Sequence, residues 1–155
     1  MGTINYKTSD YITIGYNCDN IDYDENEWYN EEIQYQFDEL AKRRAAYNFY
    51  YFHVSIEPGY YEGFSIDIEF NFTYCFDNCK EKREALKEIT QIRKFLYECV
   101  SDFECCAVSP GWCDTYYSYD ETLTRINNAV KEMKNTVKDT PTWRTLPDSE
   151  KIPLF

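Results

Sequence analysis

The chain has 155 residues and a formal net charge of −12, with 43% hydrophobic and 19% aromatic residues. This length suits one domain with a real core, and the hydrophobic content is that of a globular chain. An acidic balance of this size repels nucleic acid, so direct nucleic-acid binding is not expected. No apolar run approaches the roughly 18 residues of a membrane span, and Met1–Tyr16 lacks the basic start and apolar core of a signal peptide. We therefore expect a cytoplasmic protein with no membrane partner.

The first forty residues predict a strand, a loop and the start of a helix. Tyr11–Tyr16 is rich in β-branched and aromatic residues, which favours a strand. Residues 17–30 follow as a polar, acidic loop. Asn30 can cap a helix, and Glu31 and Glu32 then lie in its first turn, where the helix dipole favours negative charge.

The clearest pattern in the chain is a pair of alternating runs. Phe52, Val54 and Ile56 alternate with polar residues, and the stretch Phe64–Phe72 repeats the pattern. Side chains on a strand point to opposite faces with period two, so each run has one apolar and one polar face. Pro58–Gly63 lies between the runs, and its proline and two glycines predict a hairpin loop.

A long amphipathic helix is predicted over about Asn78–Val100. Its apolar stripe consists of Ala85, Ile89, Ile92, Leu96 and Cys99. Its other faces mix basic residues with Glu81, Glu84, Glu88 and Glu98. Charges of both signs at such spacing are typical of a solvated helix face.

The last third of the chain predicts a strand, a helix and a tail. Phe103–Val108 favours a strand that ends before Pro110 and Gly111. Ser118–Glu121 matches a capping box, and the following apolar spacing predicts a core helix that ends at Asp139. The prolines of residues 141–155 predict an extended C-terminal tail. The fold expected is α+β in a single domain, residues 1–155: an antiparallel sheet built on a central hairpin, with two to three helices packed on one face.

Candidate catalytic residues are few. His53 is the only histidine, and it lies on the polar face of a predicted strand, as an ordinary surface histidine would. The sequence has no nucleophile elbow, phosphate-binding glycine loop or His-Glu-x-x-His motif. Asp67, Glu69 and Lys87 could form a two-metal nuclease site only if the fold brought them together. We expect no enzyme activity.

Metal sites are also weakly indicated. The seven cysteines are expected to be reduced thiols in a cytoplasmic protein. Cys75, Cys79, Cys105, Cys106 and Cys113 could supply zinc ligands, but they lack paired Cys-x-x-Cys spacing, so buried thiols are favoured. Residues 20–31 resemble a calcium loop without its turn glycine or its preceding helix. We expect no cofactor and no metal.

Acidic residues are concentrated near the start of the chain. Met1–Leu40 contains ten acidic residues and one base, Lys7, whereas residues 41–155 contain 18 acidic and 15 basic residues. Asp19–Glu39 has nine carboxylates, no base and four interleaved Tyr or Trp residues. Such a segment is either a solvated acidic loop or a protein-binding surface, in which carboxylates attract a basic partner and aromatic rings add contact area. The partner-binding residues expected are Asp19, Asp22, Asp24, Glu25, Glu27, Trp28, Tyr29, Glu31 and Glu32.

The opening residues, Ile4–Tyr16, resemble the start of small bacteriophage and prophage proteins. The small, acidic, tyrosine-rich profile is similar to phage inhibitors of host defence, such as anti-CRISPR and anti-restriction proteins. The resemblance implies a non-enzymatic accessory protein that inhibits a basic, nucleic-acid-handling host protein, such as a nuclease. Two alternatives stay open: a phage structural or assembly protein that oligomerises through its aromatic surface, and a small enzyme or metal protein that uses the cysteines. The oligomeric state is not predicted.

Overall fold

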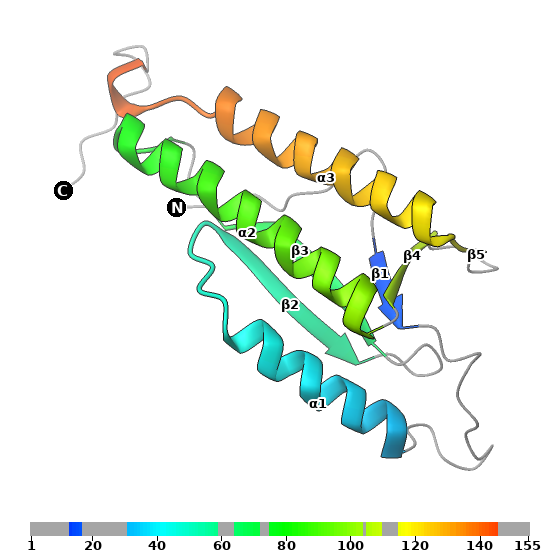
Figure 1. The fold of residues 1–155 in the computed structure, drawn as a ribbon. Coiled ribbons are helices and arrows are strands. Elements are labelled where there is room, and N and C mark those ends of the chain that lie inside the picture. Colours follow the sequence, from blue (N-terminus) through cyan, green and yellow to red (C-terminus); the bar gives the residue numbers. More distant parts are fainter. Residues whose placement is uncertain are drawn as a thin grey trace.

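The computed structural model describes residues 13–16, 31–58, 64–71, 75–103, 105–109 and 115–145. These residues have an α+β fold in which three α-helices cover one face of a five-stranded antiparallel sheet (Figure 1). The elements in chain order are β1 (Thr13–Tyr16), α1 (Glu31–Ala45), β2 (Phe52–Pro58), β3 (Phe64–Phe70), α2 (Cys79–Phe103), β4 (Cys105–Ser109), β5 (Thr115–Tyr116), α3 (Tyr119–Asp139) and a 3-10 helix (Trp143–Thr145).

The strand order of the sheet is β2-β3-β1-β4-β5. The short strand β1 lies in the middle, where Ile14 is paired with Ile66 of β3 on one side and with Ala107 of β4 on the other. The hairpin that the alternating runs predicted therefore forms one side of the sheet, and β2 is an edge strand. Strand β5 was not expected, because two residues give no alternation to detect.

The predicted hairpin is confirmed with its apolar face turned inward. Phe52 is paired with Phe70 and Val54 with Ile68 across β2 and β3. Phe52, Phe70 and Val54 are buried, whereas His53 and its partner Glu69 are exposed on the other face. Burial of one face sets the register, because a shift by one residue would expose every one of these side chains.

The helices lie side by side in the order α1, α2, α3 (Figure 1). The long helix α2 is the centre of the core, which also takes Leu40 from α1 and Ile126 from α3. The fully buried large side chains come from all three helices, from the hairpin and from one residue shortly before α2: Phe52, Phe70, Phe76, Phe95, Leu40, Ile66, Ile89, Ile92, Leu96 and Ile126. Burial of each such side chain stabilises the folded state by about 1.5–3 kcal/mol, and this is the main driving force for the arrangement.

Side chains cap α2 and α3 at their first turns. The hydroxyl of Ser118 accepts a hydrogen bond from the Glu121 N–H at 3.3 Å, as the capping box predicted. The Asn78 side chain accepts one from the Glu81 N–H at 3.0 Å, and the Glu81 carboxylate accepts one from the Asp77 N–H at 3.0 Å. Each bond satisfies a backbone donor that the helix itself leaves without a partner.

The start of α2 is fastened to the residues that follow α3. Phe76 and Thr142 form a parallel β-bridge, in which the Trp143 N–H donates to the Phe76 carbonyl at 2.9 Å. The ammonium of Lys82 donates to the Lys138 carbonyl at 2.6 Å and to the Thr140 carbonyl at 2.8 Å. The described part of the predicted extended tail therefore forms a bridge and a short 3-10 helix, because the backbone of Phe76, just before α2, pairs with it.

Candidate functional site

Most of the predicted partner-binding residues lie outside the described part of the chain. This applies to Asp19, Asp22, Asp24, Glu25, Glu27, Trp28 and Tyr29, and to the loop that resembles a calcium site. Glu31 and Glu32 are the first two residues of α1. The acidic segment Asp19–Glu39 therefore ends on a helix, and its last residues can be placed in the fold.

The described end of the acidic segment presents an exposed helix surface. Tyr35 is 59% exposed, and Asp38 lies one turn further on and is also exposed. The amide of Gln34 donates to the Asp38 carboxylate at 2.9 Å, and the ammonium of Lys42 donates to Glu39 at 3.0 Å. We call Gln34, Tyr35, Asp38 and Glu39 the α1 surface. It combines an aromatic ring with negative charge on a regular element.

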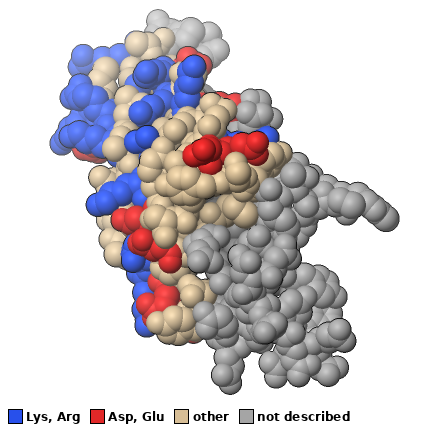
Figure 2. All heavy atoms as spheres, turned by 45° about the vertical axis from the view of Figure 1, so that its right-hand side comes forward, with Lys and Arg blue, Asp and Glu red and all other residues tan. Residues whose placement is uncertain are grey.

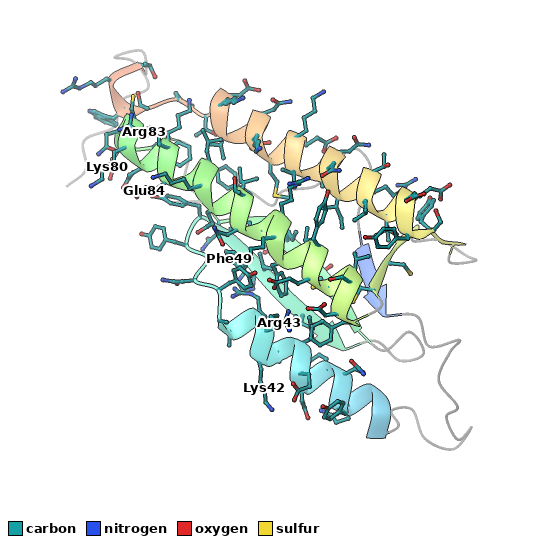
Figure 3. The ribbon with its side chains drawn as sticks, viewed as in Figure 1. Lys42, Arg43, Phe49, Lys80, Arg83 and Glu84 are labelled. Carbon is teal, nitrogen blue, oxygen red and sulfur yellow. The ribbon has the colours of Figure 1, made fainter. Side chains whose placement is uncertain are left out.

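Helix α1 is held in place by two arginines. Figure 3 shows Arg43 on the side of α1 that faces α2 and Lys42 on the outer side. The guanidinium of Arg43 lies 2.7 Å from a carboxylate oxygen of Asp102 and 3.5 Å from one of Glu98. Its hydrogen bond lowers the pKa of Asp102. These contacts tie α1 to the end of α2.

The second arginine, Arg44, bonds the backbone next to α1. Its guanidinium donates to the Val54 carbonyl at 2.8 Å and to the Tyr47 carbonyl at 3.0 Å. It also lies over the ring of Phe49, with 4.6 Å between the guanidinium carbon and the ring centroid. Because Arg44 joins α1, the following turn and β2, the α1 surface is carried on a fixed support.

The buried carboxylate of Glu88 was not foreseen. Its residue is 9% exposed, and the carboxylate accepts hydrogen bonds from the backbone N–H groups of Tyr50, Tyr51 and Phe52, the last two at 2.8 Å. Burial raises the pKa of Glu88, and the three N–H groups act against that rise. The prediction that Glu88 lies on a solvated face is wrong, because the turn before β2 offers donors that only an acceptor from α2 can satisfy. Its partners give this carboxyl a structural role.

Two tyrosines near Glu88 also bond glutamates of α2. The Tyr47 hydroxyl donates to Glu98 at 2.8 Å, and the Tyr51 hydroxyl donates to Glu84 at 3.1 Å. Burial raises the pKa of Tyr47 to about 12 and that of Tyr51 further still. Both phenols therefore stay protonated at neutral pH and act as hydrogen-bond donors that position side chains on α2.

The candidate nuclease residues are not brought together. Asp67 and Glu69 alternate with the inward-facing residues of β3, so they lie on the sheet face opposite the helices, where Glu69 is paired with the exposed His53. Lys87 belongs to α2, on the helix side of the sheet. The two-metal hypothesis for these three residues is wrong, because the sheet separates the carboxylates from the lysine.

The described cysteines are separate or buried. Cys75 is half-buried, Cys79 is exposed on α2, and Cys99 and Cys105 lie in the core. A hydrogen bond with Cys99, together with burial, raises the pKa of the Cys105 thiol. Within the described residues, no group of three or more His, Cys, Asp or Glu side chains could hold a metal ion. Cys113, the fifth candidate zinc ligand, lies outside them.

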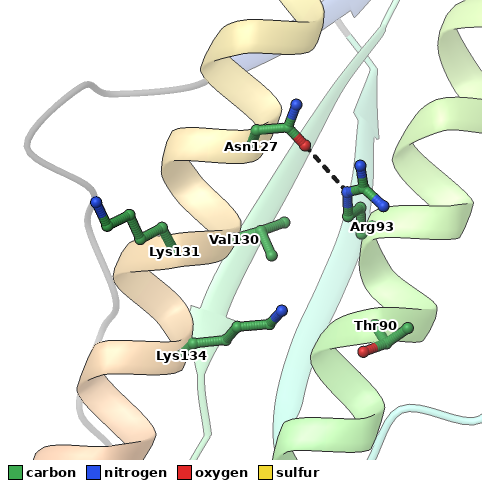
Figure 4. Close-up of a pocket in the computed structure, with 6 residues that line it drawn as sticks. All are labelled: Thr90, Arg93, Asn127, Val130, Lys131 and Lys134. Atoms are coloured by element: carbon green, nitrogen blue, oxygen red, sulfur yellow. Dashed lines mark hydrogen bonds between the residues drawn. The ribbon is translucent and has the colours of Figure 1, made fainter.

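A polar groove runs between α2 and α3, and sequence reasoning did not identify it. It has a volume of about 290 Å³ and is lined by Thr90, Arg93, Asn127, Val130, Lys131 and Lys134 (Figure 4). The Arg93 guanidinium donates to the Asn127 carbonyl oxygen at 3.0 Å and to the Tyr97 hydroxyl at 2.9 Å. The charges of α2 looked like an ordinary solvated face and those of α3 were not singled out, because only the packing of α2 on α3 brings the two sets together.

No helix among the described residues is long and apolar enough to cross a bilayer. No protein-family model, no curated protein and no solved structure matches the chain.

Proposed function

We propose that the chain is a non-enzymatic bacteriophage accessory protein that binds and inhibits a basic, nucleic-acid-handling protein of the host cytoplasm. The segment Asp19–Glu39 would be the binding surface, with nine carboxylates, no base and four Tyr or Trp residues. One structural observation supports this most directly. At its described end, the segment continues onto the α1 surface, where Tyr35 is exposed beside Asp38.

The chemistry of the segment suits a basic partner. A concentrated negative field steers a positively charged surface towards it and raises the rate of association. Tyrosine and tryptophan add large contact areas and lose little conformational freedom on binding. A nucleic-acid channel is the basic surface that a run of carboxylates would occupy, because it is built to receive regularly spaced negative charges.

The fixed position of α1 favours binding by a preorganised surface. Arg43 and Arg44 hold the helix to α2 and to β2, and Leu40 is fully buried beneath it. A partner that contacts Tyr35 and Asp38 would therefore not have to order this helix. Avoiding that ordering entropy improves affinity without additional contacts.

The test compares two charge-matched variants in a binding assay. The proteins retained from a bacterial lysate by the wild type are identified, purified and titrated against Asp22→Lys/Asp24→Lys and against Glu69→Lys/Asp139→Lys. Both variants change the net charge by the same amount, and Glu69 and Asp139 are exposed residues far from the segment in sequence. We expect at least a tenfold loss of affinity for a basic nucleic-acid enzyme in the first variant and little change in the second, with binding weakened by salt. Equal affinities for the two variants would contradict the proposal.

The phage structural or assembly protein is the second candidate. Tyr35, Tyr50 and Tyr119 are the large hydrophobic residues that are exposed among the described ones, and they could join copies of the chain. Light scattering at several concentrations separates the two functions. A defined oligomer favours the assembly protein if Tyr35→Ser, Tyr50→Ser or Tyr119→Ser dissociates it. A monomer at all concentrations favours the inhibitor.

A further inference from the structure

Basic side chains gather at the end of the molecule where α2 begins and α3 ends. Figure 2 shows Lys and Arg side chains clustered over this end, and Figure 3 shows Lys80 and Arg83 at the start of α2. Cys79–Lys94 and Asn127–Asp139 together contain nine Lys and Arg residues against five Asp and Glu residues. One of the five is Glu88, which is buried inside the fold. The local charge of this end is therefore opposite in sign to that of the whole chain.

The cations of the α2–α3 groove have no negative partners within the described residues. Lys131 and Lys134 form no ion pair there, although Lys134 is half-buried. Figure 4 shows Lys134 extending across the groove towards α2 and Lys131 pointing to the outer side. A lysine that is half-buried and whose ammonium has no carboxylate partner is a position that a bound anion would stabilise.

Arg93 lies on the opposite wall of the groove, on α2, and is positioned to bind an anion there. Its bonds to Asn127 and Tyr97 use two of its five N–H donors, and its guanidinium lies 4.5 Å above the Tyr97 ring. The three remaining donors have no partner among the described residues. A guanidinium fixed in this way loses little side-chain freedom when it binds an oxyanion.

The groove fits phosphate chemistry. Its six lining residues include Arg93, Lys134 and Thr90, whose guanidinium, ammonium and hydroxyl can contact an oxyanion. Lys131 adds a positive charge at the outer edge, and none of the six residues is an Asp or Glu. Its volume of about 290 Å³ lies at the lower limit of small-molecule pockets, and it is open to solvent. A phosphate group can enter it from solvent while the rest of the ligand stays outside, as the backbone of a polymer would.

The scarcity of exposed aromatic rings beside the groove, within the described residues, indicates which kind of polymer it would bind. Proteins that bind single strands offer aromatic rings on which bases stack. The aromatic residue next to the groove is Tyr97, whose ring is covered by Arg93 and whose hydroxyl donates to Asn127 at 2.8 Å. The groove therefore offers phosphate contacts without a surface for base stacking. We propose that the α2–α3 groove binds the phosphate backbone of duplex nucleic acid without sequence preference.

The net charge of −12 weakens this contact but does not prevent it. Fields of exposed charges are screened over a Debye length of about 10 Å at 0.1 M salt. The acidic excess lies mainly in Met1–Leu40, whereas the contact would be made by cations on α2 and α3. At short range the local positive charge decides the interaction.

The experiment measures the fluorescence anisotropy of a labelled duplex DNA of about 20 base pairs, titrated with the full chain between about 50 and 200 mM NaCl. We expect binding in the micromolar range at low salt, the usual strength of non-specific contacts, and a steep loss with added salt. Lys131→Glu/Lys134→Glu should weaken binding at least tenfold and reduce the salt slope by about two, because each phosphate contact contributes roughly 0.9 to it.

A matched control separates a local effect from a change in net charge. Lys134→Glu and Lys42→Glu change the charge equally, but Lys42 lies on the outer side of α1 (Figure 3). We expect a severalfold loss for Lys134→Glu and an unchanged affinity for Lys42→Glu. The inference is overturned if the wild type does not bind the duplex at low salt, or if the two variants bind equally well. It is also overturned if a poly-glutamate of equal charge displaces the duplex as readily as unlabelled duplex does, because the groove would then select acidic protein segments. None of these residues belongs to Asp19–Glu39, so this test and that of the proposed function can fail separately.

Discussion

Charged side chains on the two sides of α2 lie in opposite kinds of environment. On the side of β2, the carboxylate of Glu88 is buried and accepts three backbone N–H groups. On the side of α3, Arg93 and Lys134 line a groove that has no Asp or Glu among its lining residues. Both sets of charges lie on helices that are firmly packed, so the difference does not come from flexibility of the backbone.

This comparison teaches which charges belong to the fold and which are left for a partner. A buried charge whose bonds are all made inside the protein is needed to keep neighbouring backbone groups satisfied. A partly exposed charge without an internal partner stabilises nothing in the isolated chain. The predictions that follow test this distinction, from the largest expected change in stability to the smallest.

Removal of the Glu88 carboxylate should have the largest effect. Glu88→Ala leaves the N–H groups of Tyr51 and Phe52 without an acceptor in a buried position, and that of Tyr50 in a partly buried one. Each buried group without a partner costs about 1–3 kcal/mol. We expect a loss of about 3–5 kcal/mol in the free energy of unfolding, measured by urea denaturation. Glu88→Gln keeps one acceptor oxygen and should lose less. A loss below about 1 kcal/mol for Glu88→Ala would show that the turn before β2 does not depend on this carboxylate.

The pH dependence of stability should also reflect Glu88. Burial raises its pKa in the folded protein above the ordinary value of 4.5, so the folded state binds this proton more tightly than the unfolded state does. The part of the Glu88 contribution that depends on this proton is therefore fully present below pH 4.5 and is lost as the pH rises from there through the folded pKa. The difference in unfolding free energy between wild type and Glu88→Gln, measured at several pH values, should show this fall. An opposite slope would mean that the three N–H groups outweigh burial.

The ion pair between Arg43 and Asp102 should contribute less. It joins two exposed side chains at 2.7 Å, and Arg43 lowers the pKa of Asp102. A lowered carboxyl pKa adds stability that is present above the unfolded value of 3.8 and is lost as the pH falls through the folded value. We expect Asp102→Asn to lower the thermal midpoint slightly at neutral pH and by progressively less as the pH falls below 3.8. Salt should reduce the neutral shift, because the pair is exposed.

Substitution of the groove lysines should leave stability almost unchanged. Lys131→Met/Lys134→Met keeps the apolar stems and removes two charges that have no internal partner among the described residues. We expect the free energy of unfolding to change by less than about 0.5 kcal/mol, measured by the same urea titration. A larger loss would place these lysines in the fold and would remove the contrast with Glu88.

Much of the fold could be predicted because its signals are local. The alternation of Phe52, Val54 and Ile56 follows from the geometry of a single strand, and the cap at Ser118 follows from residues within one turn. The fold class, the hairpin and the starts of all three helices depend on such short-range patterns. The position of β1 in the middle of the sheet does not, because it depends on pairing with strands some 50 and 90 residues away.

The surfaces could be predicted only in part for the same reason. The acidic segment is contiguous in sequence, so its charge and its aromatic residues were plain before the fold was known. Glu88 looked like its neighbours on α2, since its partners lie in a turn nearly forty residues earlier. Lys134 and Arg93 are also about forty residues apart, and neither helix alone indicates a groove.

The edge strand β2 shows a further consequence of the bonds made by Glu88 and Arg44. Within the described residues β2 pairs with β3 alone, so its other side could recruit a strand from a second molecule and begin aggregation. The Phe52 N–H is bonded to Glu88 and the Val54 carbonyl to Arg44, which removes two of the groups that such a strand would use. Glu88 and Arg44, which attach α2 and α1 to β2, therefore also hinder the pairing of β2 with further copies of the chain into fibres.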